Sequence, residues 1–267
     1  MNSILQKHSR RNVLQTGLAA TVAALSSSNL HSQQSPRLST WEPKKPGEIS
    51  ITALCENDPT LETGLRPIMT RVKNARFWWA GNYRPITPDM INDTDLLITY
   101  YSGFIYTDKN VAAIIDGITN RGMGWLAIHN TCWFAGDKLN SLMGAYSMLH
   151  REIQPVIIHN LNQDHPITQG IEPFVIQLDE QFGVYMADPR DPDVTLLFRS
   201  HGVHDDHRTI QGWCAQRGKG RIVGMTPGHY SWTWSEPPYS EMLWRAAHWA
   251  LNLPIKPFYG SYENFIW

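Results

Sequence analysis

Three residues with acid-base side chains follow stretches that are typical of buried strands. His129 ends the apolar run 124–129, and His229 follows the apolar run 221–225. Glu180 comes soon after a third apolar run. A histidine in such a place is a general acid or base, a metal ligand, or a polar cap that bonds to the backbone. A partly desolvated carboxylate beside it could act as a base near neutral pH, whereas a solvated carboxylate at the edge would have no such role.

Two other histidine-containing stretches have simpler explanations. His165 lies in Asp-His-Pro-Ile-Thr, where aspartate, proline and threonine favour a turn and the histidine can bond across it. His201, His204 and His207 occur with two aspartates within seven residues, which is suggestive of a metal cluster. A glycine-bearing loop between strands does not give them helical i, i+3 spacing, so we expect an exposed polar loop.

The cysteines indicate neither a disulfide framework nor a zinc knuckle. Cys55, Cys132 and Cys214 lie far apart in the sequence and form no C-x-x-C pair. Cys132 invites comparison with the nucleophile elbow of glutamine amidotransferases, which needs a sharp, glycine-bounded turn. No glycine flanks Cys132, so the sequence predicts a structural cysteine there and argues against a glutaminase.

The elements that must position these residues alternate in the first half of the chain. Strands are predicted at 50–54, 75–79, 95–101 and 124–129, and helices at 61–72 and 109–120. This alternation predicts a doubly wound α/β fold with a mostly parallel, flavodoxin-like sheet. In such a sheet His129 would face the crevice at the carboxyl ends of the strands, where ligands bind.

The second half predicts fewer helices. We expect a loop and a short helix over 134–143, strands over 154–159, 174–178 and 195–199, a hairpin of 211–216 with 221–225, and a last helix over 238–251. His229 would then follow a strand that ends in a Gly-His turn ahead of the last helix.

Composition narrows the class of protein. The 267 residues, 42% of them hydrophobic, are enough for one substantial core. A formal net charge of −1 gives no electrostatic basis for binding nucleic acid. The eleven tryptophans serve either as buried anchors or as stacking surfaces for sugars and bases.

The N-terminus resembles a twin-arginine export signal. Arg10 and Arg11 precede a mildly apolar run of about ten residues, 16–25, which is too short to span a bilayer. We therefore expect a signal segment at 1–28, a Ser-, Gln- and Pro-rich linker at 29–47 and a single domain at 48–267. The expected location is the periplasm or the exterior, without stable insertion into the membrane. The alternative is a disordered basic tail.

With these motifs in place, the chain resembles the trehalose-utilisation (ThuA-like) family, whose fold is similar to that of class I glutamine amidotransferases. The resemblance extends over about 95–251. It depends on Ile128-His129, the stretch 164–170 (Asp-His-Pro-Ile-Thr-Gln-Gly), Asp179-Glu180, Gly218-Lys-Gly-Arg and Gly228-His229. In one respect the chain departs from the family, because Cys55-Glu-Asn-Asp58 follows the first strand instead of a Gly/His-rich turn.

The resemblance implies a role in carbohydrate metabolism. Together with the positions of the histidines and Glu180, it leads to the hypothesis of an enzyme that acts on a glycoside or keto-sugar as an isomerase, lyase or hydrolase. In this hypothesis His129, Glu180 and His229 are the catalytic residues, and one of them removes a proton beside a carbonyl. His129 and His229 would also hold a divalent metal such as zinc. The expected sugar-binding residues are Trp133, His165, Tyr230, Trp232 and Trp234. The alternative is a non-catalytic carbohydrate-binding or scaffold protein.

Overall fold

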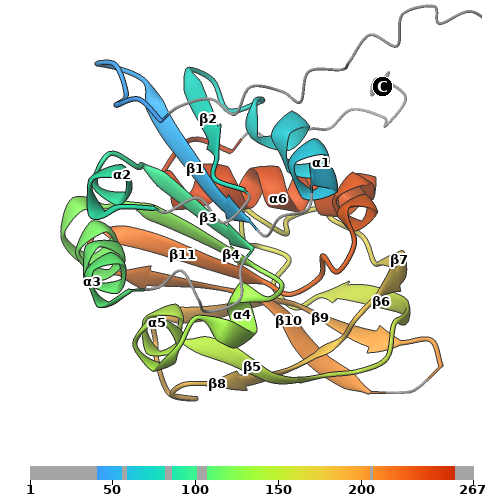
Figure 1. Ribbon diagram of the computed structural model, residues 1–267. Helices are drawn as coiled ribbons and strands as arrows, with labels where there is room; N and C mark the ends of the chain where they lie inside the picture. The colour runs from blue at the N-terminus through green and yellow to red at the C-terminus, as the bar shows by residue number, and fades with distance from the viewer. Residues whose placement is uncertain (1–40, 56–58, 82–85, 101–106, 205–206, 256–267) are drawn as a thin grey trace, which may run out of the picture. The chain divides into compact units, whose positions relative to one another are not determined.

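The computed structural model describes residues 41–55, 59–81, 86–100, 107–204 and 207–255. Their centre is a nine-stranded sheet in the order β2-β1-β3-β4-β11-β10-β9-β6-β7 (Figure 1). The first five strands in this order run parallel: β2 (Ala75–Trp79), β1 (Ile49–Cys55), β3 (Leu96–Tyr100), β4 (Gly124–Ile128) and β11 (Gly220–Met225). They form the parallel half of the sheet.

From β11 onward the neighbouring strands are antiparallel. The antiparallel half consists of β10 (Arg208–Arg217), β9 (Val194–Gly202), β6 (Gln154–Asn160) and β7 (Phe174–Asp179). The β10–β11 hairpin and the helix α6 (Pro237–Ala250) that follows it were both predicted. The structure thus confirms the doubly wound α/β fold class.

Side chains alternate between the two faces of the parallel strands, which explains why helices cover both faces. Ile98 of β3 and Leu126 of β4 belong to the core under α1 (Pro59–Met69) and α6. Leu97 and Trp125 point the other way. They join the core under α2 (Pro88–Asn92), α3 (Asp108–Asp116) and α5 (Asp137–Met143). Such two-sided burial requires the continuous apolar runs from which these strands were predicted.

Some elements differ from the sequence-based expectation. The predicted helix at 109–120 changes after α3 into one π-helical segment, Gly117–Arg121, which Gly122 ends in the left-handed conformation. The stretch 134–143 is preceded by a short helix, α4 (Thr131–Phe134). A second, two-stranded sheet of β5 (Ala145–His150) and β8 (Phe182–Met186) was not predicted. Half of β5 is exposed, so it lacks the apolar run that marks the buried strands.

The small sheet is tied to the large one by a glutamine. Gln211 of β10 is buried, and its amide nitrogen donates to the carbonyl of Phe182 at 2.7 Å. Its amide oxygen accepts from the Phe182 backbone N–H at 3.3 Å. This paired hydrogen bond holds the start of β8 against the centre of the large sheet.

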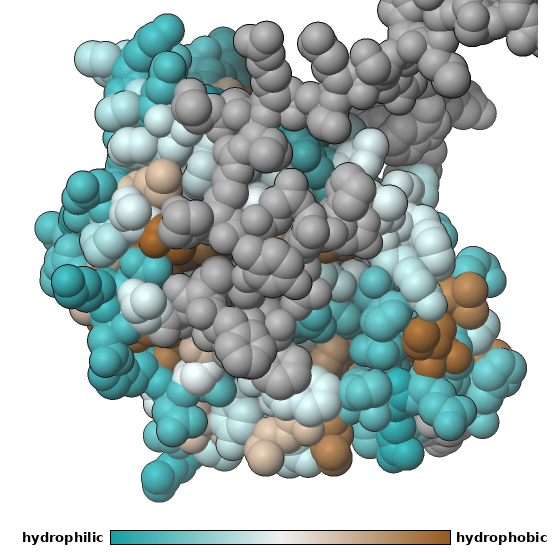
Figure 2. Space-filling model, in the orientation of Figure 1, coloured by the Kyte–Doolittle hydropathy of each residue, from teal (hydrophilic) through white to brown (hydrophobic). Residues whose placement is uncertain are grey.

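The described surface is mostly polar. Figure 2 shows a largely hydrophilic face on which hydrophobic residues form small separate areas, as is normal for a folded domain. Among the described residues, no helix has the length and apolar character needed to cross a membrane. The predicted signal segment, 1–28, and most of the predicted linker lie outside the described residues.

Candidate functional site

His129 lies in the turn between β4 and α4, in a strained conformation. Its φ of +49° is unusual for a residue with a side chain. Its ring Nδ1 lies 2.9 Å from the carbonyl oxygen of Thr226, so Nδ1 carries the proton and donates it, and Nε2 keeps a free lone pair. The residue is 1% exposed, and burial lowers the pKa of His129 to about 3. The imidazole is therefore neutral, as a metal ligand or hydrogen-bond acceptor must be.

Glu180 and His229 meet His129 at this point. Glu180 Oε1 lies 3.3 Å from His229 Nδ1, and Glu180 Oε2 lies 3.8 Å from His129 Nε2. One ligand atom from each residue can be chosen so that all three lie within 4.8 Å of one another. We call these three residues the His-Glu-His cluster. Among the described residues, no other group of three histidine, cysteine or acidic side chains comes this close together.

The spacing of the cluster suits a small divalent cation. Zinc is bound at about 2.0–2.2 Å by nitrogen and oxygen, so two ligands of a tetrahedral site lie roughly 3.4 Å apart. Glu180 approaches each histidine at close to this value, although through a different oxygen for each. With one ligand atom from each residue, the three atoms lie within 4.8 Å of one another, so a small contraction would complete the site. Three protein ligands leave a fourth position for water or substrate, as in catalytic zinc sites.

A buried aspartate adjoins the cluster. Asp179, the last residue of β7, is 0% exposed. Its carboxylate accepts hydrogen bonds from the backbone N–H groups of Glu180, Gly228 and His229 and from the hydroxyl of Thr233, at 2.8–3.2 Å. Burial raises the pKa of Asp179 to about 6, although these hydrogen bonds favour the charged form.

Three site neighbours were missed by the sequence analysis. Tyr100 stacks on the His129 ring at 5.3 Å, and Phe182 packs edge-on against it at 4.8 Å. His150 Nδ1 lies 3.5 Å from Glu180 Oε1. Tyr100 is the next-to-last residue of the predicted strand 95–101, so the search for side chains at strand ends that selected His129 could have found it. His150 and Phe182 belong to the small sheet, for which the sequence carries no clear signal.

Three of the predicted sugar-binding aromatics border the cluster. Trp133 packs against His150 at 5.4 Å. Tyr230 contacts the His229 ring at 4.5 Å and stacks on Trp232 at 4.0 Å. Trp232 is 50% exposed, which leaves part of its ring open to a ligand.

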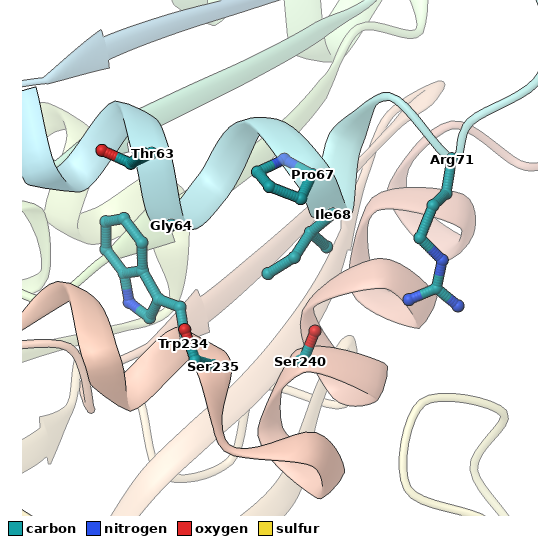
Figure 3. Close-up of a pocket in the computed structure, with 8 residues that line it drawn as sticks. All are labelled: Thr63, Gly64, Pro67, Ile68, Arg71, Trp234, Ser235 and Ser240. Atoms are coloured by element: carbon teal, nitrogen blue, oxygen red, sulfur yellow. The ribbon is translucent and has the colours of Figure 1, made fainter. Parts of the chain in front are cut away.

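Trp234 does not lie where a sugar-stacking role requires. It is 0% exposed and packs edge-on against Tyr100, at 5.7 Å. Its indole forms a wall of a separate pocket of about 100 Å³ between α1, α6 and the 3₁₀ turn Ser231–Ser235 (Figure 3). Arg71, at the other end of this pocket, is engaged by Glu241 at 3.4 Å. Trp234 is therefore a buried anchor, the alternative that the sequence left open for tryptophans.

His165 also lies apart from the cluster. Its Nδ1 accepts from the Ile167 backbone N–H at 3.3 Å, so the bond across the turn is present. Its Nε2 lies 3.5 Å from the Cys214 sulfur, and its ring packs on Trp249 at 5.5 Å. Burial lowers the pKa of His165 to about 4. These contacts anchor a turn, and none of them is with a member of the His-Glu-His cluster.

The contacts of Cys132, His201 and His207 argue against a catalytic or metal-binding role for these residues. The Cys132 thiol is buried, donates to the Ala127 carbonyl at 3.5 Å and has its pKa raised by burial, which is unfavourable for a nucleophile. His129, not Cys132, occupies the strained position of this turn. His201 pairs with His159 at 3.0 Å, and His207 lies 3.5 Å from Arg151, so these histidines point to different partners.

Comparison with known proteins identifies the family. The family model described as trehalose utilisation (ThuA) matches residues 64–250, which is more than half of the chain. The fold is similar to that of a ThuA-like protein from Bacteroides uniformis, with a TM-score of 0.61 and 15% identity over 79% of this chain and 94% of that one.

Two further solved structures share the fold. A cytoplasmic protein of Salmonella typhimurium LT2 gives a TM-score of 0.54 and 12% identity over 76% of this chain and 99% of that one. The carbohydrate deacetylase Agd3 gives a TM-score of 0.52 and 8% identity over 77% of this chain and 32% of that one. The comparison with curated proteins gives no match. The chain therefore belongs to the trehalose-utilisation (ThuA) family, as the resemblance predicts, and its function is related to carbohydrates.

Proposed function

We propose that this protein is an exported carbohydrate-processing enzyme that acts on a glycoside or keto-sugar at the His-Glu-His cluster. The observation that carries the proposal is the convergence of three ligand atoms within 4.8 Å at the carboxyl ends of the strands. His129 is fixed there in its neutral form by the Thr226 carbonyl. Membership of the ThuA family supports a carbohydrate as the substrate.

Each residue of the site has a separate role in this proposal. His129, Glu180 and His229 would hold a divalent metal such as zinc, whose Lewis acidity polarises a sugar carbonyl. His150, 3.5 Å from Glu180, would orient that carboxylate, because ligating carboxylates are usually hydrogen-bonded by a second residue. The Glu180 oxygen that does not hold the metal would accept the proton beside the carbonyl, as isomerisation or elimination requires.

The aromatic residues next to His150 and His229 would hold the sugar. Trp133 and the stacked pair Tyr230–Trp232 present rings that suit the apolar faces of sugar rings. The half-exposed Trp232 also supports the alternative, a protein that binds carbohydrate without converting it. The two functions differ in one respect, which is turnover.

One experiment tests the proposal. The metal content of the purified protein is measured, followed by turnover of a panel of glycosides and keto-glycosides with and without chelator. We expect metal-dependent turnover that His129→Ala and His229→Ala abolish, whereas His204→Ala, at an exposed histidine outside the cluster, retains it. Sugar binding that survives both cluster substitutions, with no turnover, would support the binding protein instead.

Export rests on the twin-arginine motif alone and is tested separately. Replacing Arg10 and Arg11 by lysine in the full chain should keep the protein in the cytoplasm when cells are fractionated. Unchanged distribution between the fractions would refute this part of the proposal.

A further inference from the structure

Building on the proposed function, we propose that Asp179 is the positioning residue that sets the separation between Glu180 and His229. Asp179 directly precedes Glu180 in the chain, and its carboxylate accepts a hydrogen bond from the backbone N–H of His229. A single buried carboxylate thus holds two of the three members of the His-Glu-His cluster.

The topology of the sheet shows why such a residue is needed. His229 follows β11 and Glu180 follows β7, and β10, β9 and β6 lie between these two strands. Four steps of about 4.8 Å would put the strands roughly 19 Å apart in a flat sheet. The pairing of the strands alone therefore does not bring Glu180 and His229 together, although their side chains lie 3.3 Å apart.

The hydrogen bonds of Asp179 make this connection. Oδ2 accepts from the Gly228 N–H at 2.9 Å and from the Thr233 hydroxyl at 2.8 Å. Oδ1 accepts from the His229 N–H at 3.2 Å and from the Glu180 N–H at 2.8 Å. The end of β7 is in this way fastened to the loop after β11.

Only a carboxylate satisfies all of these donors. Both of its oxygens accept, whereas an asparagine amide offers one accepting oxygen and one donating nitrogen. In Asp179→Asn the amide nitrogen would face the N–H of either Gly228 or His229, wherever the amide is turned. At least one backbone donor would then be left unsatisfied, and the loop that carries His229 would be displaced.

Metal binding by the full chain measures this positioning. We expect Asp179→Asn to weaken the binding of Zn²⁺ and Co²⁺ by about 10- to 100-fold, as is usual when an outer-shell partner of a metal site is lost. The absorption spectrum of bound Co²⁺ should change as well, because the spectrum reports the geometry of the ligands. Thr233→Val, which removes one of the four hydrogen bonds, should have a smaller effect.

A matched control separates positioning from simple destabilisation. Ile176→Ala leaves a cavity in the same strand, since Ile176 is 0% exposed and belongs to the hydrophobic core, but it removes no hydrogen bond of Asp179 and no member of the cluster. It should lower thermal stability without altering the Co²⁺ spectrum. Equal metal affinity and spectrum in Asp179→Asn and the unmodified protein would overturn the inference.

A metal-independent measurement distinguishes this inference from the proposed function. In metal-free protein, the amide protons of Gly228 and His229 should exchange at least tenfold faster in Asp179→Asn, by NMR. If the unmodified protein binds no metal, the proposed metal site fails, and the exchange rates still decide the role of Asp179. Unchanged rates would refute that role whatever the metal result.

Discussion

The two halves of the sheet contribute to the candidate site in different ways. The parallel half supplies His129 and Tyr100, which are buried at the ends of β4 and β3 and stack on each other. The antiparallel half and the small sheet supply Glu180 and His150, of which His150 is 46% exposed at its side chain. The first set is fixed by the core, whereas the second depends on a few polar contacts. We call the stacked pair Tyr230–Trp232 beside His229 the exposed rim. We expect substitutions of buried residues to lower stability and substitutions in the exposed rim to weaken binding.

The largest effect on stability is expected from Phe182→Ala. Phe182 is 1% exposed and packs on the His129 ring at 4.8 Å. Truncating a buried phenylalanine costs about 3–5 kcal/mol of the free energy of unfolding. Because the cavity would adjoin His129, metal binding should weaken as well. Chemical denaturation and metal titration measure the two losses.

A second buried phenylalanine provides the control for this comparison. Phe198 of β9 is 0% exposed and packs on Tyr239 at 6.5 Å, not on the cluster. Phe198→Ala should cost a similar free energy of unfolding but leave metal affinity within about twofold in protein that remains folded. A similar loss of metal affinity in both variants would show that the site responds to global stability and not to the packing on His129.

A smaller loss is expected from Gly228→Ala, at the junction of the two halves. Gly228 has φ of +143°, and an added Cβ would lie 2.7 Å from Trp234 Nε1. Strain and crowding together should cost about 2–4 kcal/mol. Gly170→Ala is the matched control, because its φ of +71° is also positive but no atom lies within 4 Å of the added Cβ. It should cost about 1 kcal/mol by denaturation. Equal costs would exclude the contact with Trp234 as the cause.

How much the sequence could predict also differs between the halves. The parallel strands are buried on both faces, so their apolar runs identified them and placed His129 at a strand end. Since β4 and β11 pair directly, that reasoning also put His229 nearby. No such pairing brings Glu180 close, because the contact requires the sheet to curl between β11 and β7. The small sheet was missed because β5 is half exposed, and with it His150 and Phe182.

The pH dependence of stability should report the burial of His165, which anchors a turn and does not contact the His-Glu-His cluster. Burial lowers the pKa of His165 to about 4 in the folded state, against about 6.5 in the unfolded chain. Between these values the unfolded state binds more protons, so stability falls as the pH decreases from 6.5 to 4. Because the ring is partly exposed, we expect about 1–3 kcal/mol from this group. Denaturation of the unmodified protein and His165→Gln at pH 7.5 and 4.5 measures this contribution. The free energy of unfolding should fall less between these pH values in His165→Gln than in the unmodified protein, by that amount. An equal fall in both proteins would contradict the burial of a neutral His165.

The smallest effect on stability is expected at the exposed rim, where the effect on binding should be largest. Trp232 is 50% exposed and rests on Tyr230, so Trp232→Ala should change the free energy of unfolding by no more than about 0.5 kcal/mol. If the Tyr230–Trp232 pair holds the sugar, the same substitution should weaken carbohydrate binding by about tenfold, and Trp232→Phe should restore part of it. Met148→Ala, at an exposed residue of β5 outside the aromatic pair, is the control that should alter neither quantity. Calorimetry with a glycoside ligand tests this. Unchanged affinity in Trp232→Ala would remove the rim from the binding surface and leave Trp133 as the aromatic residue beside the cluster.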